Sequence, residues 1–161
     1  HAPSYYQRGW ISHKIISPTK PSKLVYGTNQ LRNEEVEKAF FDYKKAIELD
    51  PNYKYAYYEA GKAIYLLNEF YIAIEYLEKF LKFEPNNLEG LFWLGESHLK
   101  TEQFMGAKPI PAYVTALKYF DRLIAISNSK NNKTYLNVYL SCICPILFFP
   151  NCRLGLKRHD F

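Results

Sequence analysis

KYAYYEAGKAIYLLNEFYIAIEYLEKFLKFEPNN, residues 54–87, is the stretch that decides the fold, because its punctuating residues return 34 positions away. Three series of residues keep this interval: Gly27, Gly61 and Gly95; Ala39, Ala73 and Ala107; Pro51 and Pro85. A period of this length is typical of a solenoid built from helix-turn-helix units, in which neither helix can bury its apolar face alone. The sequence therefore predicts stacked pairs of helices.

The central unit contains two amphipathic segments. From residue 54 to 67, apolar or small residues recur three or four positions apart on one helical face, at Tyr57, Ala60, Gly61, Ile64 and Leu67. From residue 70 to 83, a second stripe holds Ala73, Ile74, Leu77, Phe80 and Leu81. Gly61 and Ala73 allow the two helices to approach closely, and Pro85 ends the second helix because proline has no amide hydrogen.

These recurring residues resemble the pattern of the tetratricopeptide repeat family over residues 20–127. The resemblance implies an all-α fold, a short right-handed superhelical solenoid of antiparallel helix pairs. Its repeats would lie at about 20–53, 54–87 and 88–128. It also implies a non-enzymatic adaptor or scaffold that binds another protein, and it does not identify that partner.

The first and third units depart from the regular pattern. We expect the first helix of the first unit to begin near Lys20 and to bury four residues, which are Leu24, Tyr26, Gly27 and Leu31. In the third unit, Pro109 and Pro111 follow Ala107 and cannot both lie inside a helix. The small-residue position then falls on Ala116, nine positions late. This predicts an insertion near 107–115, a loop near 103–112 and a second helix near 113–127.

The two ends of the chain lack the repeat pattern. Residues 1–19 show no sustained helical period, and we expect a poorly ordered or loosely docked basic leader. Four of its residues could form an aromatic binding site, Tyr5, Tyr6, Trp10 and His13, although we favour simple docking on an apolar edge. Residues 135–144 are apolar enough for a capping helix within 128–161, followed by a loose basic tail.

Charge and cysteine content limit the partners and the compartment. Residues 1–33 carry five basic and no acidic side chains, residues 34–127 carry eleven and fifteen, and residues 128–161 carry five and one. Since the repeats are mildly acidic, we expect no nucleic-acid groove. The N-terminus lacks a secretory pattern, and the three cysteines do not form a disulfide framework, which predicts an intracellular, cytoplasmic or nuclear protein. The apolar run 135–149 is shorter than the roughly 20 residues that span a bilayer.

No catalytic, metal or cofactor site is expected. Cysteines and a histidine near the C-terminus lack the paired spacing of structural zinc sites; they are Cys142, Cys144, Cys152 and His159. His98 lies where the family often has tyrosine, and we predict a core histidine rather than a base, because no partner nucleophile accompanies it.

The resemblance implies that the first helix of each repeat lines a concave groove for a peptide or helix of the partner. Carried over by repeat register, the lining is Leu24, Thr28, Leu31, Arg32, Tyr55, Tyr58, Lys62, Tyr65, Leu66, Glu89, Phe92, Glu96, Leu99 and Lys100. Tyrosines suit recognition because they bury much area at low entropic cost. The alternative for each tyrosine is that it packs against the next repeat.

The family's chaperone-tail receptors grip a terminal carboxylate with basic and amide side chains. The matching positions here hold Leu24, Thr28, Glu59, Glu89 and Trp93. None of these residues is basic, so we do not expect a chaperone C-terminal carboxylate as the ligand. Two other possibilities remain open: a fragment of a larger assembly that binds along its edges, and RNA association through the basic ends.

Overall fold

The computed structural model describes residues 1–16, 29–105 and 110–129. They form helices and connecting turns with no strand. The helices are α1 (Ala2–Ile16), α2 (Asn29–Leu49), α3 (Lys54–Leu66), α4 (Phe70–Phe83), α5 (Leu88–Met105) and α6 (Ile110–Ser129). The predicted all-α fold is confirmed for this part of the chain.

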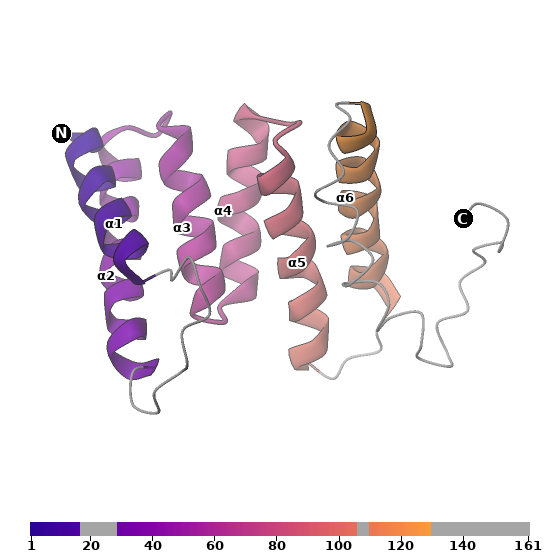
Figure 1. Cartoon of the computed structure of the whole chain (residues 1–161), viewed down its shortest axis with the longest axis horizontal. Coiled ribbons are helices and arrows are strands. Elements are labelled where there is room, and N and C mark those ends of the chain that lie inside the picture. The colour runs from indigo at the N-terminus through magenta and orange to yellow at the C-terminus, as the bar shows by residue number, and fades with distance from the viewer. Residues whose placement is uncertain (17–28, 106–109, 130–161) are drawn as a thin grey trace, which may run out of the picture.

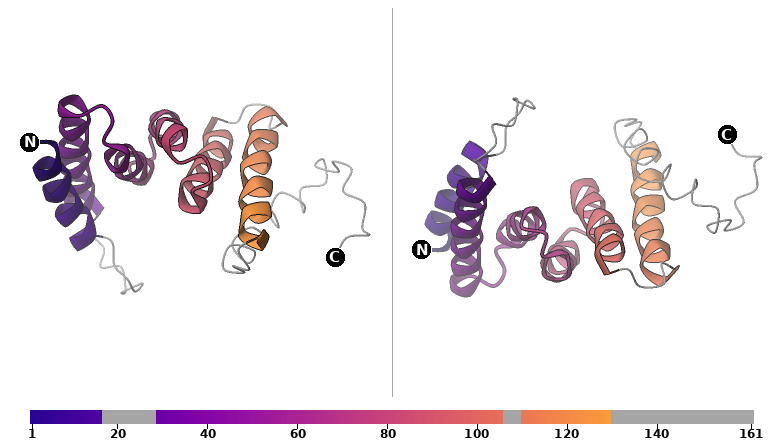
Figure 2. Two further views of the ribbon diagram at one scale, coloured as in Figure 1. Left: turned by 90° about the horizontal axis from the view of Figure 1, so that it is seen from above. Right: turned by 90° about the horizontal axis from the view of Figure 1, so that it is seen from below.

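Each described helix packs against the next one along the chain, and consecutive helices run in opposite directions (Figure 1). In Figure 2, α3 and α4 are seen nearly end on while α2 and α6 are seen from the side, so successive pairs are rotated against each other. Contacts also join α1 to α3 and α3 to α5, whereas α2, α4 and α6 do not contact one another. Helices on the inner side of a curved array approach each other, and from these contacts we infer that α1, α3 and α5 line its concave face.

Inside the pairs, a glycine in the first helix faces a large side chain of the second. A β-carbon added at Gly61 would lie 2.7 Å from Cγ of Leu77, and one added at Gly95 would lie 2.9 Å from Cε1 of Phe120. Ala73 and Ala116 are buried one helical turn before these large residues. The absence of a side chain on the glycine thus sets the separation of the two helices.

The first pair differs from our expectation. Residues 2–16, expected as a poorly ordered or loosely docked leader, form α1 and pack along α2. Gly9 takes the place expected for Gly27, since an added β-carbon would lie 2.8 Å from Cε1 of Tyr43 and 3.0 Å from the carbonyl oxygen of Ala39. Gly27 lies outside the described residues. Gly9 precedes Gly61 by 52 positions, 18 more than the repeat length, so a search at the fixed period misses it.

The insertion in the third pair lengthens both helices instead of forming one long loop. Helix α5 has 18 residues and α6 has 20, against 13 in α3 and 14 in α4. The expected loop at 103–112 is therefore wrong in extent, because α5 continues to Met105 and α6 begins at Ile110. Pro111 is accommodated in the first turn of α6, where a backbone donor is not needed.

Short turns join the successive pairs at the two recurring prolines. Before α3, the amide of Tyr53 donates to the carbonyl of Asp50 at 3.0 Å, and before α5, the amide of Asn87 donates to the carbonyl of Glu84 at 3.1 Å. Pro51 and Pro85 follow these acceptors directly and are exposed. The expected capping helix at 135–144 lies outside the described residues.

The core is a seam that runs from pair to pair. One buried cluster joins α2 to α3 and contains Val36, Ala39, Tyr43, Ala60 and Ala63. A second joins α3 and α4 to α5 and contains Tyr57, Tyr58, Leu77, Phe80 and Leu94. A third cluster, Leu99, Ala116 and Phe120, lies within the α5–α6 pair. Because the first two clusters are shared by neighbouring pairs, we expect each pair to depend on its neighbours for stability.

Candidate functional site

The three glycines provide a common register for α1, α3 and α5, and residues at the same distance from them correspond to one another. One row lies one residue after each glycine and consists of Trp10, Lys62 and Glu96. A second row lies two helical turns earlier and consists of Pro3, Tyr55 and Glu89. Residues seven apart share a helix face, so the two rows run across all three helices. We call these six residues the concave rows.

Two aromatic side chains of the concave rows are open to solvent. Trp10 is 40% exposed and Tyr55 is 47% exposed. The ammonium group of Lys54 lies 5.0 Å from the Tyr55 ring centroid, close enough for a cation-π contact. An exposed aromatic ring flanked by a cation offers a partner both apolar area and a polar contact.

Tyr58 and Tyr65, expected to line an open groove, connect α3 to α5. The Tyr58 ring packs 5.0 Å from that of Phe80, and its hydroxyl donates to Oε2 of Glu89 at 2.5 Å. Tyr58 is only 9% exposed. Tyr65 lies 5.2 Å from the Trp93 ring. Both tyrosines therefore pack against the next repeat, which the sequence analysis gave as the alternative to lining an open groove.

The hydroxyl of Tyr65 donates to Oε2 of Glu96 at 3.4 Å, over the same 31-residue separation as the bond from Tyr58 to Glu89. Burial, and then the hydrogen bond to Glu89, raise the pKa of Tyr58 above its ordinary value. Tyr58 is therefore a neutral donor throughout the physiological pH range. The two hydroxyls hold the α5 carboxylates toward α3.

Lys62 is the central residue of its concave row, and its charge is partly compensated. Its Nζ lies 3.3 Å from Oε2 of Glu59 and 4.8 Å from the Tyr58 ring centroid. Glu59 is 8% exposed, so this carboxylate is largely withdrawn from solvent. The middle of the face thus presents an ammonium group between a buried anion and an aromatic ring.

The α1 end of the face is aromatic. Tyr6 lies 5.2 Å from the ring of Tyr53 and 5.9 Å from that of Tyr43. Burial, with a contribution from the Glu59 charge, raises the pKa of Tyr6 to about 12. The sequence pattern predicts that Tyr6 and Trp10 belong to a leader that precedes the repeats. Gly9 beside them was the signal that could have placed them on a first helix.

The remaining expected lining residues fall into three groups. Leu24 and Thr28 lie outside the described residues. Leu31 and Arg32 belong to α2, the second helix of its pair, so their assignment to a first helix is wrong. Leu99 is buried, while Leu66, Phe92 and Lys100 are partly buried.

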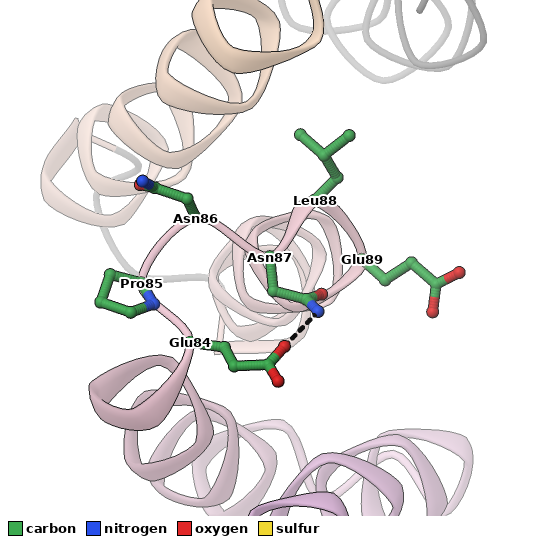
Figure 3. A pocket seen from close by; sticks show the side chains of 6 residues that line it. All are labelled: Glu84, Pro85, Asn86, Asn87, Leu88 and Glu89. Carbon is green, nitrogen blue, oxygen red and sulfur yellow. Dashed lines mark hydrogen bonds between the residues drawn. The ribbon is translucent and has the colours of Figure 1, made fainter. Parts of the chain in front are cut away.

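A hollow of about 530 Å³ lies at the turn between α4 and α5, and six residues line it: Glu84, Pro85, Asn86, Asn87, Leu88 and Glu89. Its polar groups largely serve the turn itself. Figure 3 shows Glu84 and Asn87 turned toward each other, with Asn87 Nδ2 donating to Glu84 Oε2 at 2.8 Å. Glu84 also pairs with Lys54 at 2.6 Å. We assign this hollow to the structure of the turn.

His98 lies in the interface between α5 and α6. Its ring stacks on that of Tyr119, with centroids 5.6 Å apart, and burial lowers its pKa. Within the described ranges, no three His, Cys, Asp or Glu side chains converge as they would around a metal ion. Cys142, Cys144, Cys152 and His159 lie outside those ranges.

No protein-family model matches the chain. A stretch of 51 residues, 32% of the chain, is 41% identical to tetratricopeptide repeat protein 6 of Homo sapiens. The match covers 10% of the length of that human protein. This local likeness and the stacked helix pairs agree with a tetratricopeptide-like solenoid.

Every helix in the described part of the chain is too short or too polar to pass through a lipid bilayer.

Proposed function

We propose that the chain is a protein interaction module whose concave face, formed by α1, α3 and α5, binds an extended segment of a partner protein. One observation carries the proposal: Trp10 and Tyr55 stay about half exposed on this face. The likeness to a tetratricopeptide repeat protein supports the general class of function.

The chemistry of the concave rows changes along the array. Trp10 on α1 is followed by Lys62 on α3 and Glu96 on α5, and Pro3 is followed by Tyr55 and Glu89. Each row therefore passes from an apolar to an acidic side chain. A partner segment that lies across the three helices would meet these side chains in order, which gives it one preferred direction.

Aromatic residues are effective anchors for such a segment. Trp and Tyr bury a large apolar area while fixing only two side-chain torsions, and their ring N–H or O–H can still bond to the partner backbone. Hot spots of protein interfaces are enriched in these residues. Trp10 and Tyr55 lie on separate helices, so one peptide can contact both only in the folded array.

Binding of random linear peptides displayed on phage tests the proposal. We expect enriched peptides to lose about tenfold or more in affinity when Trp10→Ala or Tyr55→Ala is introduced, because an aromatic anchor contributes at least about 1.4 kcal/mol. Tyr71→Ala is the matched control. Tyr71 is an aromatic residue of α4 that is 57% exposed and lies on the side of that helix opposite to the buried residues Ala73 and Leu77. Far-ultraviolet circular dichroism verifies that each variant is folded.

Two results would reject the concave face as the binding surface. One is an affinity that neither Trp10→Ala nor Tyr55→Ala changes. The other is an affinity that falls equally with Tyr71→Ala, which would move the binding surface to the outer helices.

A further inference from the structure

Each inner helix pair packs onto the preceding pair through small or apolar residues of its first helix. These residues lie five positions before, one position before and two positions after the glycine that faces the second helix of the pair. In α3 they hold Ala56, Ala60 and Ala63, and in α5 they hold Gly90, Leu94 and Ser97. All six residues are buried.

The space at these positions is tight. A β-carbon added at Gly90 would lie 2.8 Å from Cε1 of Phe80 and 3.0 Å from Cδ2 of Leu81, both on the preceding helix. Ala60 and Ala63 belong to the same buried cluster as Val36, Ala39 and Tyr43 of α2. Small side chains are therefore what lets one pair approach the next.

The same three positions of α1 hold Ser4, Arg8 and Ile11. All three are exposed in the structure, and the Arg8 side chain is 64% exposed. Two of the three are polar, and the largest of them carries a charge. The outer surface of α1 thus lacks the composition that α3 and α5 use for stacking.

The second helices of the pairs also differ, because α2 has a charged residue where α4 and α6 have an aromatic one. The residue three after the buried alanine is Tyr76 in α4 and Tyr119 in α6. Tyr76 lies 5.5 Å from the Phe40 ring of the preceding pair. The corresponding residue of α2 is Asp42.

Arg8 and Asp42 are paired with each other. Nε of Arg8 donates to Oδ2 of Asp42 at 2.7 Å, and Nη2 donates to Oδ1. Asp42 is 7% exposed, and the guanidinium carbon of Arg8 also lies 5.0 Å from the Tyr5 ring centroid. This two-bond geometry satisfies the largely buried carboxylate of Asp42 within the chain.

We propose that the outer face of α1 and α2 closes the array, so that no helix pair stacks on it as α3 stacks on α2. A pair placed there would have to bury the Arg8 guanidinium beside the already buried Asp42 carboxylate, and would meet an arginine where the inner pairs have alanine or leucine. The proposal rests on the residues at these positions, Arg8 and Asp42 in place of small, apolar or aromatic side chains.

The test adds one helix pair in front of α1. A second copy of residues 54–87 is joined so that its last residue, Asn87, is followed by Ala2, just as Asn87 is followed by Leu88 in the chain. This extension is made on the wild-type background and on Arg8→Ala with Asp42→Tyr, which installs the residues of the α3–α4 pair. A matched control replaces another ion pair of the same sign pattern on α2, with Lys38→Ala and Glu35→Tyr.

Hydrogen exchange, followed by mass spectrometry, reports whether the added pair stacks. We expect its amides to exchange freely on the wild-type and control backgrounds, and at least about tenfold more slowly on the Arg8→Ala, Asp42→Tyr background. Amides of the original α3 show in each case that the array is folded.

Two results overturn the proposal. Protection of the added pair on the wild-type background shows that the face accepts a helix pair, and this comparison does not depend on how the double variant folds. If the amides of the added pair exchange freely although the Arg8→Ala, Asp42→Tyr variant is folded, the Arg8–Asp42 ion pair is not what prevents stacking on this face.

Discussion

Gly61→Ala is the substitution that most directly tests how the helix pairs are held together. The new methyl group would lie 2.7 Å from Cγ and 2.9 Å from Cδ2 of Leu77, a side chain that is fully buried and cannot turn into solvent. Alanine favours the helix over glycine by about 1 kcal/mol. Overpacking a tight core costs about 1–3 kcal/mol. We expect a net loss of roughly 1 kcal/mol in the free energy of unfolding.

The sign of this effect should reverse when the obstacle is removed. Leu77→Ala alone leaves a cavity and costs about 2–5 kcal/mol. In that background the methyl group at residue 61 has room, so Gly61→Ala should stabilise the protein by up to about 1 kcal/mol through helix propensity. The coupling between the two sites is therefore about 2 kcal/mol, within the range measured for residues in contact.

Urea unfolding followed by far-ultraviolet circular dichroism measures all four proteins of the cycle. Gly95→Ala with Phe120→Ala repeats the design in the third pair, where the added β-carbon would lie 2.9 Å from the Phe120 ring. If Gly61→Ala changes stability by the same amount in both backgrounds, close approach at the glycine does not determine the separation of the helices, and the packing argument fails.

Two further predictions concern polar groups between the helices. Tyr58→Phe keeps the ring against α4 but removes the hydrogen bond to Glu89, and it should lower the free energy of unfolding by about 1 kcal/mol. Tyr65→Phe should lower the free energy of unfolding by less, because its hydrogen bond to Glu96 is long. Equal losses for the two variants in urea unfolding would contradict this prediction. Burial lowers the pKa of His98 below 6.5, so the unfolded chain binds a proton that the folded chain excludes, and stability falls as the pH drops below about 6.5. His98→Phe should lose less stability than wild type between about pH 7.5 and pH 5.5, and identical losses in the two proteins would refute the role of His98.

The helical units between residues 54 and 105 were predictable because short-range patterns specify them. Apolar residues three and four apart define a buried face, and the equal spacing of Gly61 and Gly95 shows where that face must approach a neighbour. The first helix of the array was missed for a physical reason. The apolar pattern of α2 shows that it needs a covering helix, but not which segment covers it, and Gly9 is displaced from the period by the long connection to α2.

The candidate binding surface was predictable only by position. Repeat register places Tyr55, Tyr58 and Tyr65 on the concave side of α3. Exposure depends on the rotation of the next helix, which brings Glu89 and Trp93 of α5 against the second and third of these tyrosines and leaves the first open. Sequence spacing carries no information about that rotation.

Local amphipathic patterns and a constant period were sufficient to determine the all-α solenoid, the close contact of Gly61 with the second helix of its pair, and the displacement of the third small residue to Ala116. Only the tertiary structure decided that α1 covers α2 and which aromatic side chains reach solvent. The physical reason is that a helix records in its own residues which face must be buried, whereas the identity and rotation of the element that buries it depend on the packing of the whole array.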